Sequence, residues 1–326
     1  MTGPRASGFG PRFGALLLAL ASCQRHDTST SADSDDDDRA ACDPRTPRQC
    51  VANDVVACEP DGKLGRRVRT CKSGCADGAC IASCSQDGVQ LIYLVDTAEE
   101  LLSFDPRKLP GDPFKVVGRL ACGGRGSPFS MAVDRGGTAW ILYGDGQMFA
   151  ASILDAKCKP TAYRGDITFG MGFVSDSAGS DSETLYTSAN DGTFALQTID
   201  KQLRPHTVGT LMGTSGNSPE LTGTAGARLF GFYPSDLEPA YVQEIERTTG
   251  QPKGVKWPIA DSAFPINAYA FAQFGGIFYV FTTSENDSGV TAIDPRTGEH
   301  HVVMHHLPFR VTGAGVSTCA PERDGG

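Results

Sequence analysis

The sequence predicts an all-β fold, a β-propeller of about five four-stranded blades preceded by a small disulfide-rich module. In residues 128–153, apolar residues alternate with small or polar ones, and Asp and Gly clusters separate three short stretches. Period-two alternation interrupted by such turn residues is typical of antiparallel strands. Comparable blocks recur roughly every 40–50 residues along the chain, which is the spacing of propeller blades.

Three short turn sequences support the same division into blades. FDPR at 104–107 and IDPR at 293–296 follow an expected strand in two different blocks, and IDK at 199–201 takes the same place in a third. A two-sheet β-sandwich is the alternative fold, because it also gives alternating strands with regular turns. Since a sandwich rarely repeats one turn at the same offset, the propeller is favoured.

The two ends of the repeating region complete one another. The first block contains three expected strands, beginning with 91–95, and lacks a fourth, whereas a strand at 311–317 follows the last full block. We predict that these two segments pair in one sheet, which closes the ring and removes exposed edges. The propeller domain is accordingly expected at 84–320, with a short disordered tail at 321–326.

Closure of the ring predicts how the cysteines of the propeller pair. Cys84 lies just before the first block and Cys319 just after the last strand, so a ring closed in this way brings them together. Cys122 and Cys158 are then expected to form a second disulfide, by elimination. In the chain-entropy model, a disulfide across so long a loop stabilises a fold by roughly 4–5 kcal/mol.

A separate cysteine-rich module is predicted at 42–83. It has too few large aliphatic residues for a core of its own, so crosslinks must replace burial. Three disulfides are expected, and the sequence does not choose among the possible pairings. A zinc site is the alternative, but the spacings differ from paired CxxC knuckles and the module has no histidine. The cysteines concerned are Cys42, Cys50, Cys58, Cys71, Cys75 and Cys80.

The N-terminus has the features of an export signal, predicted at 1–22. Arg5 and Arg12 precede an apolar core at 13–21, which is too short to span a bilayer as a helix. The sequence LASC, which ends at Cys23, resembles the lipobox of bacterial lipoproteins. This resemblance implies cleavage before Cys23 and attachment of lipid to its thiol; secretion without a lipid is the alternative.

The residues after the lipobox extend this resemblance. Gln24, rather than Asp, follows Cys23, which in the lipoprotein family favours the outer membrane of a Gram-negative cell. The polar segment 23–41, with its aspartate run at 35–38, lacks apolar residues to bury and is expected to be a disordered tether. The chain thus resembles uncharacterised Gram-negative lipoproteins in which short cysteine-rich repeats follow such a tether.

Charge and cysteine content limit the compartment and the partners. The chain has 29 Lys+Arg against 38 Asp+Glu, which argues against nucleic acid, since phosphate binding requires a basic surface. Its 11 cysteines are too many for a reducing cytosol unless they bind metal, so an exported chain with disulfides is expected. The expected partners are the membrane, through the lipid, and a protein or carbohydrate ligand of a monomeric propeller.

A ligand site is expected at the mouth of the central channel, which the innermost strands line. Glu220, Asn267 and Thr222 are the candidate ligand-binding residues. Two strong oxygen ligands do not make a tight site for a hard cation, so no metal or other cofactor is expected, and no catalytic residue is assigned. The residues expected to line the channel are Phe129, Met131, Gly170, Gly172, Glu220, Thr222, Asn267 and Thr312.

Four histidines in the sequence HHVVMHH, at 300–306, are a second candidate for metal binding. In a strand, His301 and His305 would lie ~13 Å apart, too far for one metal ion. The neighbouring pair His305 and His306 would point to opposite faces. We therefore interpret this segment as an exposed outer strand with polar ends.

The leading functional hypothesis is a lipid-anchored, non-enzymatic protein of the cell envelope whose propeller binds a ligand or partner. The chain contains no GxSxG nucleophile motif and no Walker sequence. The second hypothesis is a metal-dependent, lactonase-like hydrolase or a lyase at the channel mouth, with Glu220 and Asn267 as its main residues. The third is a structural spacer of the envelope.

Overall fold

The computed structural model describes residues 42–322 apart from 53, 72–74, 77, 81–83, 85, 166, 179, 215, 236–237, 261–264 and 286. The expected signal peptide at 1–22, the lipid-bearing Cys23, the tether at 23–41 and the last tail residues therefore lie outside the described residues. Within the described part of the chain, no helix reaches the length and apolar character needed to span a bilayer.

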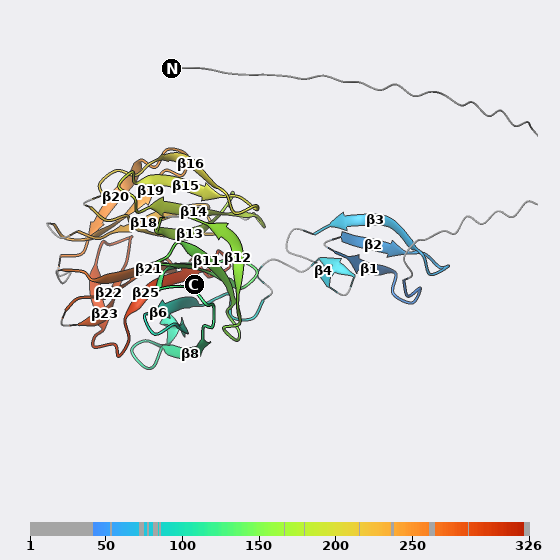
Figure 1. Ribbon diagram of the computed structural model, residues 1–326, viewed down its shortest axis with the longest axis horizontal. Helices are drawn as coiled ribbons and strands as arrows, with labels where there is room; N and C mark the ends of the chain where they lie inside the picture. Colours follow the sequence, from blue (N-terminus) through green and yellow to red (C-terminus); the bar gives the residue numbers. More distant parts are fainter. Residues whose placement is uncertain are drawn as a thin grey trace, which may run out of the picture. The chain divides into compact units, whose positions relative to one another are not determined.

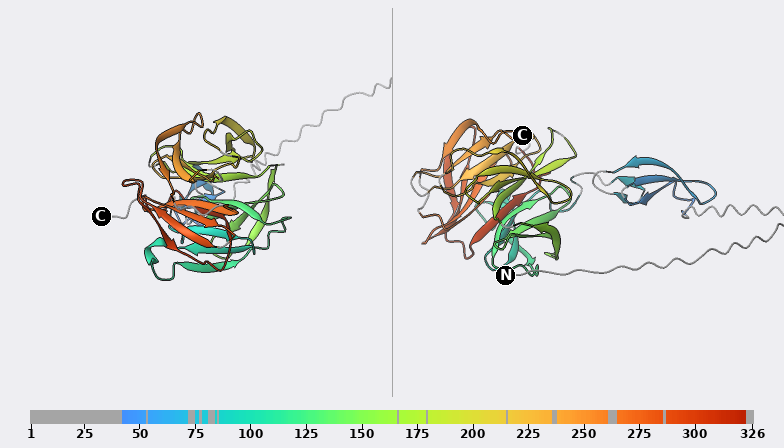
Figure 2. Two further views of the ribbon diagram at one scale, coloured as in Figure 1. Left: turned by 90° about the vertical axis from the view of Figure 1, so that its left-hand side faces the viewer. Right: turned by 45° about the horizontal axis from the view of Figure 1, so that its top comes forward.

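Five four-stranded antiparallel sheets follow one another around a ring in the described residues (Figure 1, Figure 2). We number these blades 1 to 5 and give each from its innermost to its outermost strand. Blade 1 consists of β9 (Pro128–Val133), β10 (Thr138–Tyr143), β11 (Gln147–Ser152) and β12 (Cys158–Arg164). Blade 2 consists of β13 (Phe169–Ser175), β14 (Glu183–Ala189), β15 (Ala195–Ile199) and β16 (Pro205–Thr210). Blade 3 consists of β17 (Glu220–Gly223), β18 (Leu229–Tyr233), β19 (Tyr241–Ile245) and β20 (Pro252–Pro258). Blade 4 consists of β21 (Ala268–Phe274), β22 (Ile277–Thr283), β23 (Ser288–Ile293) and β24 (His300–Met304). Blade 5 consists of β25 (Val311–Val316), β6 (Ile92–Asp96), β7 (Glu100–Phe104) and β8 (Phe114–Arg119). The predicted fold class, a propeller of about five blades, is confirmed.

Blade 5 combines strands from both ends of the propeller domain. β25 pairs antiparallel with β6, with Ala314 opposite Leu94, and Figure 1 shows the two strands side by side. The predicted closure of the ring by its N- and C-terminal strands is therefore confirmed. A disulfide joins Cys84 to Cys319 across 235 residues of sequence, which is the pair that the closed ring predicts.

Apolar side chains fill the spaces between neighbouring blades. Between blades 5 and 1, a buried cluster includes Met131, Ile141 and Tyr143. The disulfide between Cys122 and Cys158, the pair predicted by elimination, belongs to the same cluster. The side chain of Met131 is thus part of the core between blades, and the prediction that it lines the channel is wrong.

The innermost strands approach one another so closely that glycine is required. A Cβ on Gly172 in β13 would lie 2.9 Å from the carbonyl oxygen of Leu221 in β17. A Cβ on Gly315 in β25 would lie 2.8 Å from the backbone nitrogen of Val133 in β9. Side-chain carbons essentially never come this close to backbone atoms. Gly170 and Gly172, which were expected to line the channel, therefore allow blades 2 and 3 to pack backbone against backbone.

The repeated turn sequences have a common structural basis. In blades 2, 4 and 5, the chain passes from the third strand to the outermost strand through an aspartate. Its Oδ1 accepts a hydrogen bond from the backbone N–H two residues later, which fixes a tight turn locally. The distances are 3.2 Å for Asp105 and Arg107, 2.8 Å for Asp200 and Gln202, and 2.9 Å for Asp294 and Arg296.

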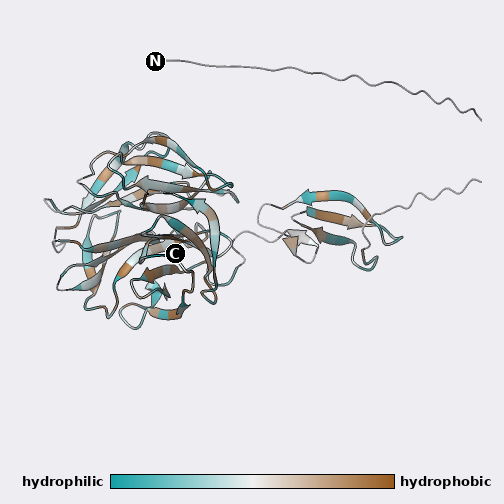
Figure 3. Cartoon of the chain, in the orientation of Figure 1, coloured by the Kyte–Doolittle hydropathy of each residue, from teal (hydrophilic) through white to brown (hydrophobic). Residues whose placement is uncertain are grey.

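The cysteine-rich module contains a three-stranded antiparallel sheet and a short hairpin. The sheet consists of β1 (Arg48–Val51), β2 (Asp54–Cys58) and β3 (Leu64–Thr70), and the hairpin of β4 (Cys75–Ala76) and β5 (Ala79–Cys80). β2 is mostly hydrophobic and β3 mostly hydrophilic (Figure 3). Accordingly Val55 and Val56 are buried, whereas most of β3 is exposed.

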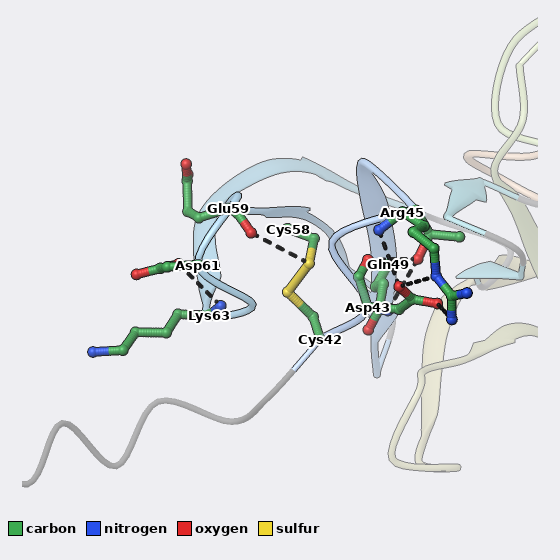
Figure 4. Close-up of a disulfide and its surroundings, with 9 residues drawn as sticks. Cys42, Asp43, Arg45, Gln49, Cys58, Glu59, Asp61 and Lys63 are labelled. Carbon is green, nitrogen blue, oxygen red and sulfur yellow. Dashed lines mark hydrogen bonds and ion pairs between the residues drawn. A yellow bond between two sulfur atoms is a disulfide. The ribbon is translucent and has the colours of Figure 1, made fainter.

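Disulfides supply the links that this small sheet cannot obtain from burial. One joins Cys42 to Cys58 and a second joins Cys50 to Cys75. Cys71 is also disulfide-bonded, and the side chain of Cys80 lies outside those described. Figure 4 shows the first bridge next to the turn that carries Asp61 and Lys63. These bonds choose among the pairings that the sequence left open.

Candidate ligand site at the channel mouth

A cavity of about 440 Å³ lies at the end of the channel where the innermost strands begin. We call it the mouth cavity. Phe129, Glu220, Ala268 and Thr312 stand at or next to the first residue of β9, β17, β21 and β25, so four blades contribute directly. The other lining residues come from the adjoining loops and strands: Thr97, Ser127, Pro128, Asn190, Asn217, Ile266, Asn267, Tyr269 and Arg310.

Glu220 forms the buried floor of the mouth cavity. Glu220 is only 2% exposed, and its Oε2 accepts a hydrogen bond of 3.0 Å from Ser130 Oγ in β9. The backbone N–H groups of Met171 and Leu221 also donate to the carboxyl group, so it links β9, β13 and β17. Burial raises the pKa of Glu220 well above its ordinary value, and these hydrogen bonds only partly oppose the rise. Burial of the floor therefore favours the neutral form of this carboxyl group.

Asn267 and Arg310 lie at the rim of the mouth cavity. The Arg310 guanidinium donates a hydrogen bond to the backbone carbonyl of Asn267. The backbone of each residue is held as well, since Asn267 N–H donates to Thr283 at 2.8 Å and the Arg310 carbonyl accepts from Thr97 N–H at 3.1 Å. Among the described residues, no carboxylate forms an ion pair with Arg310. The rim therefore presents a guanidinium held by a backbone carbonyl, above the buried carboxyl group of the floor.

Further polar groups of the mouth cavity are fixed by hydrogen bonds. Asn190 Nδ2 donates to Thr168 Oγ1 at 3.3 Å, and Asn190 Oδ1 accepts from Ser218 N–H at 3.4 Å. The Tyr269 hydroxyl donates to the Ser218 carbonyl at 3.0 Å. Together with the Phe129 ring, these groups offer amides, a hydroxyl and aromatic faces in a concave site, which is typical of ligand-binding pockets.

The structure brings together two of the three predicted ligand-binding residues. Glu220 and Asn267 line the same cavity, but Thr222 does not. Thr222 is buried two residues further along β17, where its hydroxyl accepts a hydrogen bond of 3.2 Å from Gln273 N–H. Its role is to join β17 to β21.

Several residues of the mouth cavity were not anticipated from the sequence. Ser130, which does not line the cavity but donates to Glu220 at its floor, was missed because only its neighbours Phe129 and Met131 were assigned to the channel. Arg310 directly precedes β25, as Asn267 directly precedes β21. A search for polar residues immediately before each inner strand would have found Arg310, whereas Asn190 comes from a loop that no periodicity identifies.

At the opposite mouth, where the inner strands end, side chains fill the side of blades 1, 2 and 5, and we call this network of Arg135, Ser175, Glu183 and Thr318 the filled mouth. A cavity of about 440 Å³ lies beside it, between blades 3 and 4, and is lined by Thr224, Gln273 and Glu322 among others. Arg135 Nη1 donates hydrogen bonds to Thr318 Oγ1 at 2.8 Å and Ser175 Oγ at 3.2 Å, and Nη2 lies 3.2 Å from Cys84 Sγ. Glu183 accepts from the Arg135 backbone N–H at 2.7 Å and from the Thr318 hydroxyl at 2.8 Å. Burial raises the pKa of Glu183 to about 7 despite these hydrogen bonds. This network ties together the ends of β9, β13 and β25.

The start of the C-terminal tail also packs at the ends of the inner strands. The Pro321 carbonyl accepts a hydrogen bond of 2.7 Å from Gly275 N–H, directly after β21. The Glu322 carboxylate accepts one from Gly226 N–H, shortly after β17. Pro321 and Glu322, which were expected to belong to the tail, thus contact the ends of β21 and β17.

The histidine segment forms the outermost strand of blade 4, as predicted, but its end differs from the expectation. His305 Nδ1 lies 3.2 Å from Asp287 Oδ2, and His306 Nδ1 lies 3.0 Å from Asp287 Oδ1. β24 ends at Met304 and His306 has a φ of 53°, so strand alternation no longer applies. The two rings thus meet at one carboxylate instead of pointing to opposite faces. Among the described residues, no group of three or more His, Cys, Asp or Glu is arranged to hold a metal ion.

The fold and the mouth cavity define a five-bladed, disulfide-closed propeller with a polar concave site. No protein-family model matches the chain, and no curated protein matches its sequence. A chain in the crystal structure of a nidogen/laminin complex is similar in fold, with a TM-score of 0.43 and 14% identity over 82% of this chain and 96% of that chain. At this identity the likeness concerns the fold alone.

Two bacterial structures are similar to the same extent. One is the extracellular domain of a protein described as a hybrid two-component system from B. thetaiotaomicron, with a TM-score of 0.38 and 14% identity over 68% of this chain and 27% of that chain. The other is a protein described as TolB from Agrobacterium tumefaciens, with a TM-score of 0.41 and 13% identity over 70% of this chain and 82% of that chain.

Proposed function

We propose that this chain is a lipid-anchored protein of the cell envelope whose monomeric propeller binds a ligand at the mouth cavity without transforming it. The lipid anchor at Cys23, the tether and the outer membrane of a Gram-negative cell rest on the lipobox resemblance. The disulfides indicate an exported protein, because such bonds persist in oxidising compartments.

The observation that carries the binding function is the composition of the mouth cavity. Asn190 and Tyr269 offer polar groups fixed by hydrogen bonds, Asn267 adds an amide, and Arg310 offers a cation without an acidic partner among the described residues. The carboxyl group of Glu220 is already engaged by Ser130 and two backbone N–H groups. Groups fixed before the ligand arrives reduce the entropy lost on binding.

A mouth-cavity hydrolase or lyase remains the second candidate because of Glu220. A buried carboxyl group with a raised pKa is the type of group that serves as a general acid in enzymes. In this structure the carboxyl group also joins three inner strands, which gives it a structural role that needs no chemistry. The third candidate, a structural spacer, gives no reason for a hollow polar mouth.

Ligand arrays test the binding function directly. The full chain, purified in detergent, is applied to a glycan array and to a displayed peptide library. We expect a ligand that is retained by the wild-type protein and weakened about tenfold by Asn267→Ala together with Tyr269→Ala. A ligand that binds the doubly substituted protein as well as the wild type would favour another binding site. Turnover that Glu220→Gln abolishes without unfolding the chain would favour the enzyme.

Labelling of cells with a radioactive fatty acid tests the anchor. Wild-type protein should take up the label and fractionate with the outer membrane, whereas Cys23→Ser should not be labelled. Label that persists on the Cys23→Ser protein would contradict the proposed lipid site.

A further inference from the structure

We propose that the ligand of the mouth cavity is an extended protein segment that places a carboxylate on Arg310 and a neighbouring apolar side chain in an adjoining groove. This inference rests on the binding function proposed above. Its basis is a second cavity that shares lining residues with the first and differs from it in chemistry.

The second cavity, which we call the side groove, has a volume of about 810 Å³ and lies between blades 5 and 4. It shares Thr97 and Arg310 with the mouth cavity, so the two adjoin at these residues. Its walls include Phe114, Val116 and Phe309. Val116 is 53% exposed, although it is a valine in the outermost strand β8. An apolar wall left open to solvent next to a polar cavity suits a ligand with both kinds of group.

Arg310 stands where the two cavities meet, and its charge is not balanced by a described carboxylate. Arg164 and Arg247 likewise bond to backbone carbonyls, but neither lines the mouth cavity or the side groove. Two other surface arginines are paired with carboxylates. Arg296 lies 2.8 Å from Asp294 Oδ2 and Arg107 lies 2.7 Å from Asp105 Oδ1. Since an arginine fork binds a carboxylate through two parallel hydrogen bonds, Arg310 is suited to an acidic group supplied from outside.

The acidic residues of the side groove fix where the ligand's carboxylate can lie. The Asp96 carboxylate is occupied by the backbone N–H groups of Ala98 at 2.9 Å and Glu100 at 2.8 Å. The Glu100 side chain also lines the groove and would repel a second acid there. The ligand's acidic group therefore belongs at Arg310, and the part that enters the groove should be apolar and uncharged.

These features favour a protein segment over a glycan. A sugar chain carries hydroxyl groups and has no branched apolar side chain to fill a groove lined by Phe114, Val116 and Phe309. A peptide offers an apolar side chain next to an acidic one, and its backbone can exchange hydrogen bonds with the amides of Asn190 and Asn267. The site thus fits a segment in which Asp or Glu adjoins a large apolar residue.

Panning of a phage-displayed random peptide library tests the inference. The full chain in detergent is immobilised through a C-terminal tag, and enriched peptides are resynthesised for titration. We expect enriched sequences to contain Asp or Glu beside Leu, Ile, Phe or Met. Arg310→Gln should weaken their binding about tenfold, whereas the matched control Arg296→Gln should change it less than about twofold.

A double-mutant cycle assigns the contact to Arg310. Replacing the peptide's acid by its amide should weaken binding to the wild-type chain and have no further effect on Arg310→Gln. Val116→Asp should weaken binding as well, because it places a charge in the side groove. Thermal unfolding of each variant shows whether the fold is kept.

The outcomes separate this inference from the proposed function. Enriched peptides without an acidic residue, or peptides that bind Arg310→Gln as well as wild type, overturn the inference. Acidic oligosaccharides that bind in an Arg310-dependent manner, with no enriched peptide, overturn it while the mouth remains a binding site. If neither library gives a ligand that depends on the mouth cavity, the proposed function fails too.

Discussion

The two mouths of the channel are formed by the same inner strands, yet their centres differ. The mouth cavity opens where the strands start, whereas at the strand ends the side chains of Arg135, Ser175 and Thr318 fill the side of blades 1, 2 and 5, and a cavity of about 440 Å³ lies between blades 3 and 4. The strand starts surround a cavity with Arg310 at its rim, whereas the strand ends are bridged by Arg135 and the Cys84–Cys319 disulfide. The difference follows from the way in which the ring closes. Both ends of the domain meet at the strand ends, so the network there stabilises the closed ring.

Loss of the ring-closing disulfide should have the largest effect on the filled mouth. Replacing Cys84 and Cys319 by Ser frees a loop of 235 residues in the unfolded chain, which the chain-entropy model values at up to about 5 kcal/mol. Thermal and denaturant unfolding of the double variant measures the loss. Replacing Cys122 and Cys158, which are only 36 residues apart, should cost less, and the reverse order would contradict this account of closure.

The two arginines of the mouths should differ sharply in their effect on stability. Arg135→Met removes the partner of Ser175, Thr318 and the disulfide region, so we expect a loss of about 2–4 kcal/mol in unfolding free energy. Arg310→Met at the exposed rim should cost less than about 0.5 kcal/mol. Equal losses measured by urea unfolding would show that the mouths do not differ as described.

The pH dependence of stability should report on Glu183 in the filled mouth. Its pKa is raised from 4.5 to about 7 in the folded protein, so the folded state holds a proton that the unfolded state releases. Stability should therefore be full below about pH 4.5 and fall as the pH rises through 7, by about 1–2 kcal/mol after allowance for solvent screening. The buried Glu220 acts in the same direction.

The variant Glu183→Gln separates these two contributions. If Glu183 is responsible, melting temperatures measured between pH 4.5 and 8 should decline less steeply in the variant than in the wild type. An unchanged slope would assign the decline to other groups.

Ser130→Ala should have a small effect, at the floor of the hollow mouth. It removes the 3.0 Å hydrogen bond to Glu220, and the backbone N–H groups of Met171 and Leu221 remain. We expect a loss of about 1 kcal/mol in unfolding free energy. A loss above about 3 kcal/mol would mean that the floor supports the ring as strongly as the filled mouth does.

The architecture could be predicted from the sequence because local chemistry repeats in it. Alternation marked the strands, and the turn aspartates Asp105, Asp200 and Asp294 marked equivalent positions in three blades, each through the same side-chain-to-backbone bond. The missing strand of the first block then required the C-terminal strand as its partner. From this closure the pairing of Cys84 with Cys319 followed directly.

The site could be predicted only in part, because small irregularities decide where side chains point. A register shift between Leu142 and Tyr143 disturbs the pairing of β9 near its start, so Phe129 lines the mouth cavity while Met131 packs between blades. Likewise the positive φ of His306 ends the alternation that the histidine argument assumed. Arg310 was missed because the expected last strand began at 311.

Hydrogen–deuterium exchange with an enriched peptide bound is the most direct test of the central claim that the hollow mouth is the binding surface. Bound peptide should slow exchange at the strand starts, around 127–130, 217–220, 266–269 and 310–312. The strand ends, around 134–137 and 224–227, should exchange as in the free protein. Slower exchange confined to the strand ends would contradict the account and move ligand binding to the mouth here assigned to stability.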